Sequence, residues 1–451
     1  METVYKRLIE EIEEKKQIIL DAERYVWKHP EAGYKEWKTH AYLKEQFEKL
    51  GYTVTELGNI PGFYADVETG RPGPRVAVFG EMDALIIPGH PECDPETGAV
   101  HACGHNCQVA GLLGVAIGLK APHALDDLSG SIRLIAVPAE ELIDVEFRRE
   151  LKKQGKIRYF GGKLELIYRG VLDDVDMAMM VHASGSQCVS INKGSNGCIV
   201  KKATFIGVSA HAGGSPHNGR NALYAATCAI NAANALRETF KDADHIRFHP
   251  IITAGGSVVN AIPDNVVVES YIRGATMDAI KDANEKINRA FAGAAASMGC
   301  RVILEDQHGY APRFNDPNFT EVYRKAALQV LPEEKVKVNQ NFGTGCSDMG
   351  DVSTLMPTIH PYAGGAIGSG HGTDYYIQDP VLATVTSAKM QVCILALLLK
   401  DNAAEARNIV ANKQVVYHSR EEYLAAIDSL SETVDAVRYR EDGSIVLTNR
   451  P

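Results

Sequence analysis

The chain has 451 residues, of which 45% are hydrophobic and 23% are charged, and its formal net charge at pH 7 is −10. This length predicts two domains with ample core, and the composition is that of an ordinary soluble globular protein. The negative charge argues against nucleic acid or an anionic membrane as a partner. No run reaches about 18 uninterrupted apolar residues, so we expect no membrane-spanning helix.

The cysteines and the N-terminus indicate a cytoplasmic protein. Nine cysteines are scattered along the chain, an odd number that fits reduced thiols better than a disulfide framework. Residues 1–7 open a charged helix and lack the apolar core of a signal peptide.

The first 80 residues predict helices followed by strands. One amphipathic helix is expected over 2–29, ended by His29-Pro30, and a second over 36–50, ended by Gly51. Strands are expected at 54–57, 62–67 and 75–79. The last of these is a continuous apolar run, which is typical of a buried parallel strand.

Ionisable residues follow three successive buried strands. Strand 75–79 leads to Glu81 and Asp83, strand 131–137 leads to Glu140 and Glu141, and strand 177–181 leads to His182. The carboxyl ends of parallel strands meet at one edge of a sheet, where open α/β folds place their sites. Such groups are costly to bury unless they are paired or bound to metal. Helix caps and solvent-facing loop ends are the alternative.

The segment His101-Ala102-Cys103-Gly104-His105 offers thiolate and imidazole ligands within five residues. A thiolate and an imidazole two residues apart can share one metal or bridge two. A buried cysteine beside a helix-start histidine would give the same pattern without any metal. An apolar helix is expected at 109–119.

Two further segments are predicted to lie on the surface. The loop between Leu85 and His101 is polar and rich in Pro and Gly, and its His90, Glu92, Cys93 and Asp94 are read as solvated rather than as an extra metal cluster. Residues 144–162 are charged and irregular, which indicates an inserted surface excursion.

Residues 196–308 read as a separate inserted domain. Their expected order is β-α-β-β-α-β, the ferredoxin-like arrangement, which is complete in itself. We therefore predict an α/β catalytic domain over 1–195 and 309–451, with a mixed, mainly parallel sheet, and an inserted domain over 196–308. The tail from 405 onward suggests a helix and a hairpin around Asp442-Gly443, with no evident chemistry.

Taken together, the motifs resemble the dinuclear metallopeptidase and amidohydrolase family of aminoacylase, carboxypeptidase G and dipeptidases. The branch of aminobenzoyl-glutamate hydrolases and auxin-conjugate amidohydrolases is the nearest in pattern. The motifs run in a specific order along most of the chain: 29–34, 80–85, 101–106, 138–141, 207–219 around His211, 260–263, 346–350 and His371.

The resemblance implies a metallopeptidase-type fold that holds two divalent metals, with Zn²⁺ or Mn²⁺ favoured and Ni²⁺ next. It assigns five ligands, which are more than one tetrahedral site needs. They are Cys103, His105, Glu141, His182 and His371. Asp83 would orient an imidazole, and Glu140 would be the general base that takes the proton from metal-activated water.

The same resemblance gives roles to the inserted domain, which would be a lid and dimerisation domain. His211 would cross to the partner subunit's site and stabilise the oxyanion of the tetrahedral intermediate. Asn260 and Arg273 would bind the substrate, with Arg273 gripping a carboxylate. We expect a homodimer or a higher oligomer.

The expected function is cleavage of the amide bond of an N-acyl amino acid or a dipeptide-like substrate. A ureido-type amidohydrolase and a non-catalytic metal-binding regulatory relative are the alternatives. Glu81 stands where relatives carry His or Asp, so it is left out of the ligand set, and Asn106 stands where many relatives have Asp.

Overall fold

The computed structural model describes residues 2–448, which form two compact units. Unit 1 comprises the residues up to Gly194 together with Phe314–Phe342 and Asp351–Arg420. Unit 2 comprises Ser195–Arg313, Gly343–Gly350 and the described residues from Glu421 onward. The predicted boundaries put everything after residue 308 in the catalytic domain, whereas the structure places the C-terminal segment with the inserted unit.

Unit 1 is built on a mixed six-stranded sheet. Its strands, in spatial order, are β1 (Thr55–Glu56), β2 (Phe63–Glu68), β6 (Ser131–Val137), β3 (Arg75–Glu81), β7 (Met177–Met179) and β19 (Thr358–Ile359). The central strand β3 runs parallel to both β6 and β7, while β2 runs antiparallel to β6. The predicted strand ends therefore meet at one edge of the sheet.

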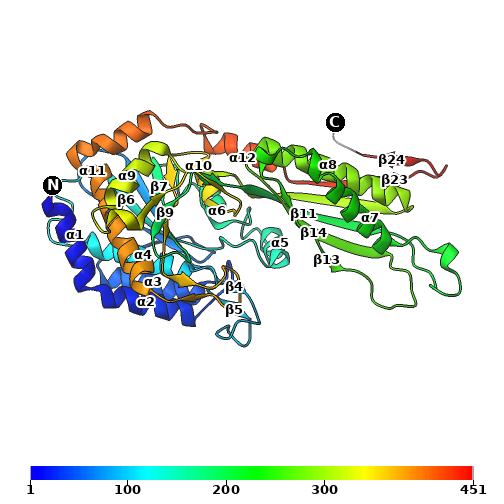
Figure 1. Ribbon diagram of the computed structural model, residues 1–451, viewed down its shortest axis with the longest axis horizontal. Coiled ribbons are helices and arrows are strands. Elements are labelled where there is room, and N and C mark those ends of the chain that lie inside the picture. The colour runs from blue at the N-terminus through cyan, green and yellow to red at the C-terminus, as the bar shows by residue number, and fades with distance from the viewer. Residues whose placement is uncertain (1, 449–451) are drawn as a thin grey trace. The chain divides into compact units, whose positions relative to one another are not determined.

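Helix α4 (His105–Gly118) is the core helix of unit 1, and each of its residues is buried. It packs against β3 and against several other helices (Figure 1). These are α1 (Glu2–Glu14), α2 (Lys16–Lys28), α3 (Trp37–Lys49) and α11 (Ser387–Ala411). The single helix predicted over 2–29 is divided at Lys15, whose ψ of 15° leaves the helical region.

The helical segment Val381–Ala411 has a mean hydropathy of 1.8 over its most apolar window, enough in length and composition to cross a membrane. The sequence predicted no such helix. Most of that window, 72%, is buried within the protein. Its contacts with α1, α4 and α9 (Pro317–Ala327) are those of a core helix.

The segment between β4 (Leu85–Ile86) and β5 (Ala99–Val100) is folded against the protein rather than solvated throughout. His90 is buried, its Nδ1 accepts from the Glu92 N–H, and its Nε2–H donates to the Tyr375 carbonyl at 2.9 Å. The prediction of a surface loop is therefore wrong for His90, because its partner Tyr375 lies far away in the sequence.

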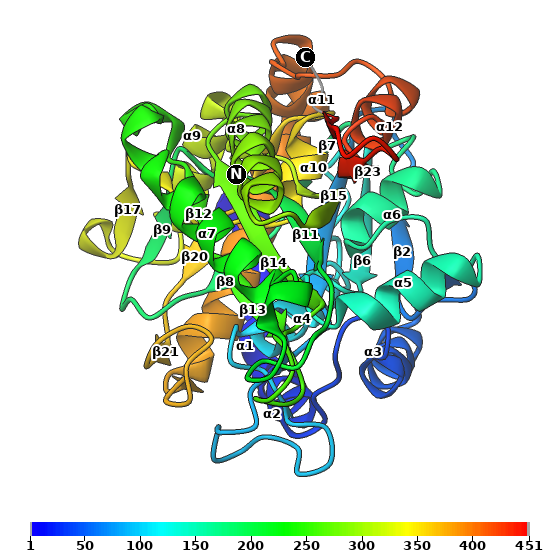
Figure 2. The same cartoon turned by 90° about the vertical axis from the view of Figure 1, so that its right-hand side faces the viewer.

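Unit 2 has the predicted order β-α-β-β-α-β. Its elements are β11 (Gly197–Ile206), α7 (Ala222–Ala235), β13 (Ile251–Ala254), β14 (Asn265–Gly274), α8 (Met277–Ser297) and β15 (Arg301–Tyr310). A two-residue strand, β12 (Arg247–Phe248), precedes β13 and also pairs with β14. β11 pairs antiparallel with β14 on one side and β15 on the other, and α7 and α8 pack together on the sheet (Figures 1 and 2). The side chains of Asn221 and Thr276 cap the two helices, as residues with short polar side chains commonly do.

The C-terminal segment extends this sheet. After α12 (Arg420–Asp428), β23 (Glu432–Tyr439) pairs antiparallel with β15, and β24 (Ile445–Leu447) pairs with β23. This pairing explains why the segment belongs to unit 2, and it covers an edge of β15 that would otherwise be open.

Candidate metal centre

The loops after three parallel strands bring seven of the predicted site residues together in unit 1. β3 leads to Asp83, β6 leads to Glu140 and Glu141, and β7 leads to His182 in β8 (His182–Ala183). Helix α4 begins at His105, directly after Gly104, whose φ of +93° turns the chain into the helix. Cys103 precedes this turn, and His371 approaches from the segment that follows β21 (Ala366–Ile367).

Asp83 links two of the predicted ligands. Its carboxylate oxygen Oδ1 lies 3.1 Å from His105 Nδ1, and its Oδ2 accepts from the Glu141 N–H at 2.8 Å. The same Nδ1 lies 2.9 Å from the Asp83 carbonyl oxygen. Since carbonyl and carboxylate oxygens only accept, Nδ1 of His105 carries a proton, and Nε2 is the nitrogen left to face the cluster. Cys103 and Glu81 raise the pKa of His105 well above its ordinary value although burial opposes the shift, so a metal at Nε2 would take the place of a proton.

His182 is oriented in the same way by its own chain. Its Nδ1 donates to the Ala183 carbonyl at 2.7 Å, which leaves the lone pair on Nε2, 3.5 Å from Cys103 Sγ. Burial, followed by the nearby His105, lowers the pKa of His182 to about 4, so its imidazole is neutral at pH 7. A neutral imidazole is the form that binds metal.

His371 is far from the other predicted ligands in sequence, but it lies beside them in space. Its Nε2 is 3.3 Å from Glu141 Oε1, and its backbone N–H donates to the Ala102 carbonyl at 2.9 Å. Its φ of +63° is unusual for a residue with a side chain. Such backbone strain persists where the surrounding structure requires it, often at functional sites.

The donor set fits divalent metal ions. Three groups have ligand atoms that all lie within 4.8 Å of one another: Cys103–His105–His182, Cys103–Glu141–His371 and Glu81–His105–Glu140. Cys103 is shared by two of these groups and His105 by two. The buried atom His105 Nε2 lies 3.1 Å from Glu81 Oε2, and the buried Glu141 Oε1 lies 3.3 Å from His371 Nε2. Imidazole nitrogens, a thiol and carboxylate oxygens gathered this closely are the ligand types that Zn²⁺ takes in proteins.

Glu81 belongs to this cluster, although sequence reasoning left it out of the ligand set. Its Oε2 lies 3.1 Å from His105 Nε2 and accepts from Gln108 Nε2 at 2.7 Å. Its Oε1 pairs with the ammonium of Lys163, a residue of α6 (Gly162–Tyr168) with no exposed surface. Burial alone would raise the pKa of Glu81, but Lys163 and His105 lower it below its ordinary value.

Lys163 was missed because one lysine in an otherwise apolar helix start is indistinguishable from a solvated one in sequence. The pKa of the Cys103 thiol is shifted in the opposite direction from that of Glu81. Burial, followed by the Glu141 carboxylate, raises the pKa of Cys103 well above its ordinary value, and the opposing effect of His105 is too small to hold it as a thiolate. A bound divalent cation supplies the missing positive charge.

His211 lies in unit 2 and is exposed. Its Nδ1 accepts from the N–H groups of Gly213 and Gly214, at 3.2 and 2.9 Å, so the neutral ring carries its proton on Nε2. The Ala212 N–H donates to the carbonyl of Asn260, which is also exposed. The two predicted residues are therefore neighbours on adjoining loops.

Arg273 lies on β14, opposite Cys198 of β11. A hydrogen bond from Cys198, followed by the positive charge of Arg273, lowers the pKa of Cys346 below its ordinary value, although burial opposes the shift. Sequence reasoning gave no role to either cysteine, and their separation of 148 positions hides the contact.

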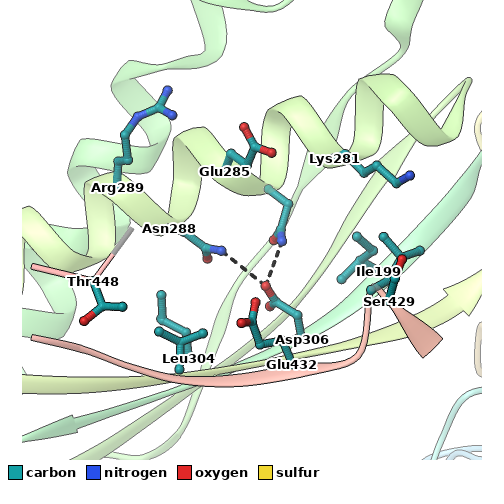
Figure 3. A pocket seen from close by; sticks show the side chains of 13 residues that line it. Ile199, Lys281, Glu285, Asn288, Arg289, Leu304, Asp306, Ser429, Glu432 and Thr448 are labelled. Carbon is teal, nitrogen blue, oxygen red and sulfur yellow. Dashed lines mark hydrogen bonds between the residues drawn. The ribbon is translucent and has the colours of Figure 1, made fainter. Parts of the chain in front are cut away.

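A different cavity lies within unit 2. It has a volume of about 350 Å³ and is bounded by α8, β15 and the C-terminal segment (Figure 3). Asn288 and Asp306 are among its lining residues, and none of the residues predicted for the site is.

Comparison with known proteins agrees with these observations. A family model described as peptidase family M20/M25/M40 matches residues 77–394. An Xaa-Arg dipeptidase from Mus musculus is 29% identical over 382 residues, which cover 80% of each chain. An indole-3-acetyl-aspartic acid hydrolase from Enterobacter agglomerans is 29% identical over 357 residues, covering 67% of this chain and 77% of that protein.

A solved structure shows the same fold. The dinuclear metal-binding M20 peptidase from Bacillus subtilis aligns with a TM-score of 0.63 at 20% identity, covering 88% of this chain and 99% of that one. The family match spans well over half of the sequence. The chain therefore belongs to peptidase family M20/M25/M40, and it is a hydrolase of carbon–nitrogen bonds from a family that binds two metals.

Proposed function

We propose that this protein cleaves the amide bond of an N-acyl amino acid or a dipeptide, releasing a free amino acid. The observation that carries the proposal is the cluster of Cys103, His105, Glu141, His182 and His371, with Glu140 beside it. His105, Glu140 and Glu141 are buried, whereas Cys103 and His182 are partly exposed and His371 is exposed. Two relatives support the substrate class, since one is a dipeptidase and the other hydrolyses indole-3-acetyl-aspartic acid. Both substrates place an amide next to an amino acid with a free carboxylate.

Glu140 is the proposed general base. It is buried, it adjoins Glu141, and its Oε2 is 3.9 Å from His105 Nε2. Two divalent cations held by the cluster, Zn²⁺ or Mn²⁺ in this proposal and Ni²⁺ as the next choice, would polarise the amide carbonyl and acidify a water molecule. Glu140 takes the proton of that water and then returns a proton to the nitrogen that leaves. The carboxylate is regenerated at the end of each cycle.

His211 and Arg273, both in unit 2, are proposed to bind the substrate. His211 would reach the site from a second copy of the chain. The Nε2–H of His211 is a donor suited to an oxyanion, and a guanidinium suits a substrate carboxylate, with Asn260 adding a hydrogen bond. β13 supports a homodimer because its Ile251 is 62% exposed and lies on an open strand edge.

A cytoplasmic location is proposed from the cysteines. All nine are free in the structure, including those that are buried. This is the state that a reducing compartment maintains.

The test replaces Glu140 by Gln, which keeps the shape of the side chain but cannot take a proton. The parent is first reconstituted with Zn²⁺ or Mn²⁺ and screened by mass spectrometry against dipeptides and N-acyl amino acids. On the best substrate, E140Q should lower kcat by about 10²- to 10⁴-fold while its metal content is unchanged.

The matched control is E150Q, on an exposed glutamate of α5 (Val145–Lys153), which should keep the parent kcat. Turnover by E140Q at the parent rate would show that Glu140 is not the base. Absence of hydrolysis by the metal-loaded parent across the whole panel would overturn the substrate class.

A further inference from the structure

The turn that carries Glu140 and Glu141 is strained. Ala139, between Pro138 and the two carboxylates, has a φ of +57°. This left-handed conformation is unfavourable for a residue with a Cβ. Some other part of the protein must hold the turn in place.

Side chains and backbone groups from several segments bind the backbone of this turn. The Ala139 N–H donates to Glu36 Oε1 at 2.8 Å, and the Gly162 N–H donates to the Ala139 carbonyl at 3.1 Å. Asp83 accepts from the Glu141 N–H. The Glu141 carbonyl accepts from the guanidinium of Arg148 and from the Ile143 N–H, the latter at 2.9 Å.

Arg148 lies on α5, in the excursion between β6 and β7 that the sequence placed on the surface (Figure 2). The structure contradicts that placement, because the side chain has no exposed surface. Its Nη2 donates to the Glu141 carbonyl, and its Nη1 donates to the Phe160 carbonyl at 2.7 Å and reaches the Ala139 carbonyl at 3.5 Å. One guanidinium thus binds the carbonyls of Ala139 and Glu141 in the strained turn and the carbonyl of Phe160 near the end of the excursion.

Residues far away in sequence form the pocket that holds this guanidinium. A Cβ on Gly33 would lie 2.4 Å from Arg148 Nη2 and 3.0 Å from Ala139 Cα, so only glycine leaves room here. The neighbouring Tyr34 places its ring 5.6 Å from the guanidinium carbon. The segment 29–34, which the sequence singled out as a motif without a role, forms the wall of this pocket.

We propose that Arg148 is a positioning residue for the two carboxylates of the reaction. It fixes the backbone of residues 139–141, so that Glu141 faces the metal cluster while Glu140 faces the attacking water. This inference rests on the proposed function for the role of Glu140, but its effect on Glu141 concerns metal binding alone. An arginine is required because one planar group must supply several donors in fixed directions, which an ammonium cannot do.

The experiment compares R148K with the parent in metal affinity, kcat and KM. The lysine keeps the charge but reaches fewer carbonyls, so the turn relaxes. We expect metal affinity, measured by titration calorimetry on chelated protein, to fall about 10- to 100-fold, as it does when groups that orient ligands are lost. On the best substrate, kcat should fall at least about 10-fold at saturating metal, with KM within about twofold of the parent.

The matched control is R149K, on the adjacent residue of the same helix, where the arginine pairs with Glu146 near the surface. It should match the parent in all three quantities. G33A is the second variant, because its methyl group crowds both the guanidinium and Ala139 without changing any charge, and it should reproduce the effects of R148K. It also replaces R148K as the test if that variant does not fold.

The inference is overturned if folded R148K or G33A binds metal and turns over substrate as the parent does, since Arg148 would then serve stability only. That result would leave the proposed function intact. Conversely, a parent without hydrolytic activity would overturn the proposed function, and the calorimetric comparison would still decide whether Arg148 positions Glu141.

Discussion

Each unit buries a lysine against a carboxylate, but the two clusters differ in their balance of charge. In unit 2, Lys201 pairs with Asp306, whose Oδ2 also accepts from Asn284 at 2.7 Å and Asn288 at 3.2 Å (Figure 3). In unit 1, Lys163 pairs with only one of four neighbouring carboxylates, those of Glu81, Asp83, Glu140 and Glu141. The first cluster is balanced without any further ion, and the second has an excess of negative charge that a cation offsets.

Metal removal is expected to have the largest effect, and it should change unit 1 while leaving unit 2 unchanged. A chelator should abolish turnover and increase amide hydrogen exchange around the Cys103–His105 segment and residues 138–141, because the excess carboxylates then repel one another. At metal concentrations about 1,000 times the dissociation constant, the stabilisation lost is about 4 kcal/mol. Mass-spectrometric hydrogen exchange measures it by region.

The control is built into the same experiment, since the strands around Lys201 and Asp306 should exchange equally fast with and without metal. Equal exchange at the Cys103–His105 segment would contradict a metal site there. Zn²⁺ or Mn²⁺ should restore both turnover and protection.

Breaking each lysine pair tests the balance of charge directly. K163M and K201M each leave a buried carboxylate without its cation, and each should lower the stability of its unit by about 3 to 5 kcal/mol in urea denaturation of chelated protein. Metal should then stabilise K163M more than it stabilises the parent, because the freed Glu81 carboxylate lies beside His105 Nε2 and can pair with the cation.

K201M should gain from metal only what the parent gains. If metal stabilised the two variants by equal amounts, Glu81 would not be part of the metal environment. Circular dichroism of both variants at each urea concentration supplies the measurement.

The edge of the unit 1 sheet could be predicted because its strands are continuous apolar runs with ionisable residues directly after them. The parallel pairing of β3 with β6 and β7 then follows from chain order, and so does the approach of Glu141 to Asp83. The β-α-β-β-α-β order of unit 2 was readable for the same reason, since its helices and strands differ clearly in periodicity.

Arg148 and Lys163 could not be predicted in this way. Both lie in or next to a charged stretch whose composition is that of a solvated surface, and their burial depends on partners more than six residues away, such as the Glu141 carbonyl and Glu81. The pairing of β23 with β15 was hidden similarly, because hydrogen bonds between distant strands leave no local pattern.

Replacing Asp83 by Asn tests whether this carboxylate positions His105 and Glu141 for metal binding. The amide still accepts one hydrogen bond, but it has no charge to polarise His105, and it cannot satisfy both His105 Nδ1 and the Glu141 N–H as well as the carboxylate does. Metal affinity should fall about 10- to 100-fold by calorimetry. D127N, at an exposed aspartate, should bind metal as the parent does, and an unchanged affinity in D83N would remove Asp83 from the site.

The smallest expected effect concerns His101, which is buried and whose ring nitrogens make no hydrogen bond among the described residues. Burial, with the nearby His105, lowers its pKa to about 3. An unfolded histidine titrates near pH 6.5, so below that pH the unfolded chain binds one proton more than the folded protein. The stability contributed by neutral His101 is therefore complete above about pH 6.5 and is lost as the pH falls toward 3.

His101→Leu should remove this difference in bound protons between the unfolded and the folded protein. Between pH 6.5 and 5, the unfolding free energy of chelated parent protein should fall more steeply than that of H101L, by about 0.7 kcal/mol per pH unit at pH 6.5 and by about 1.4 kcal/mol per pH unit at pH 5. Urea denaturation at three pH values measures the two slopes, with H217Q, at an exposed histidine, as the control. Parallel slopes for H101L and the parent would mean that His101 takes up a proton in the folded state. Its segment would then be open to water, unlike the closed core around Lys201.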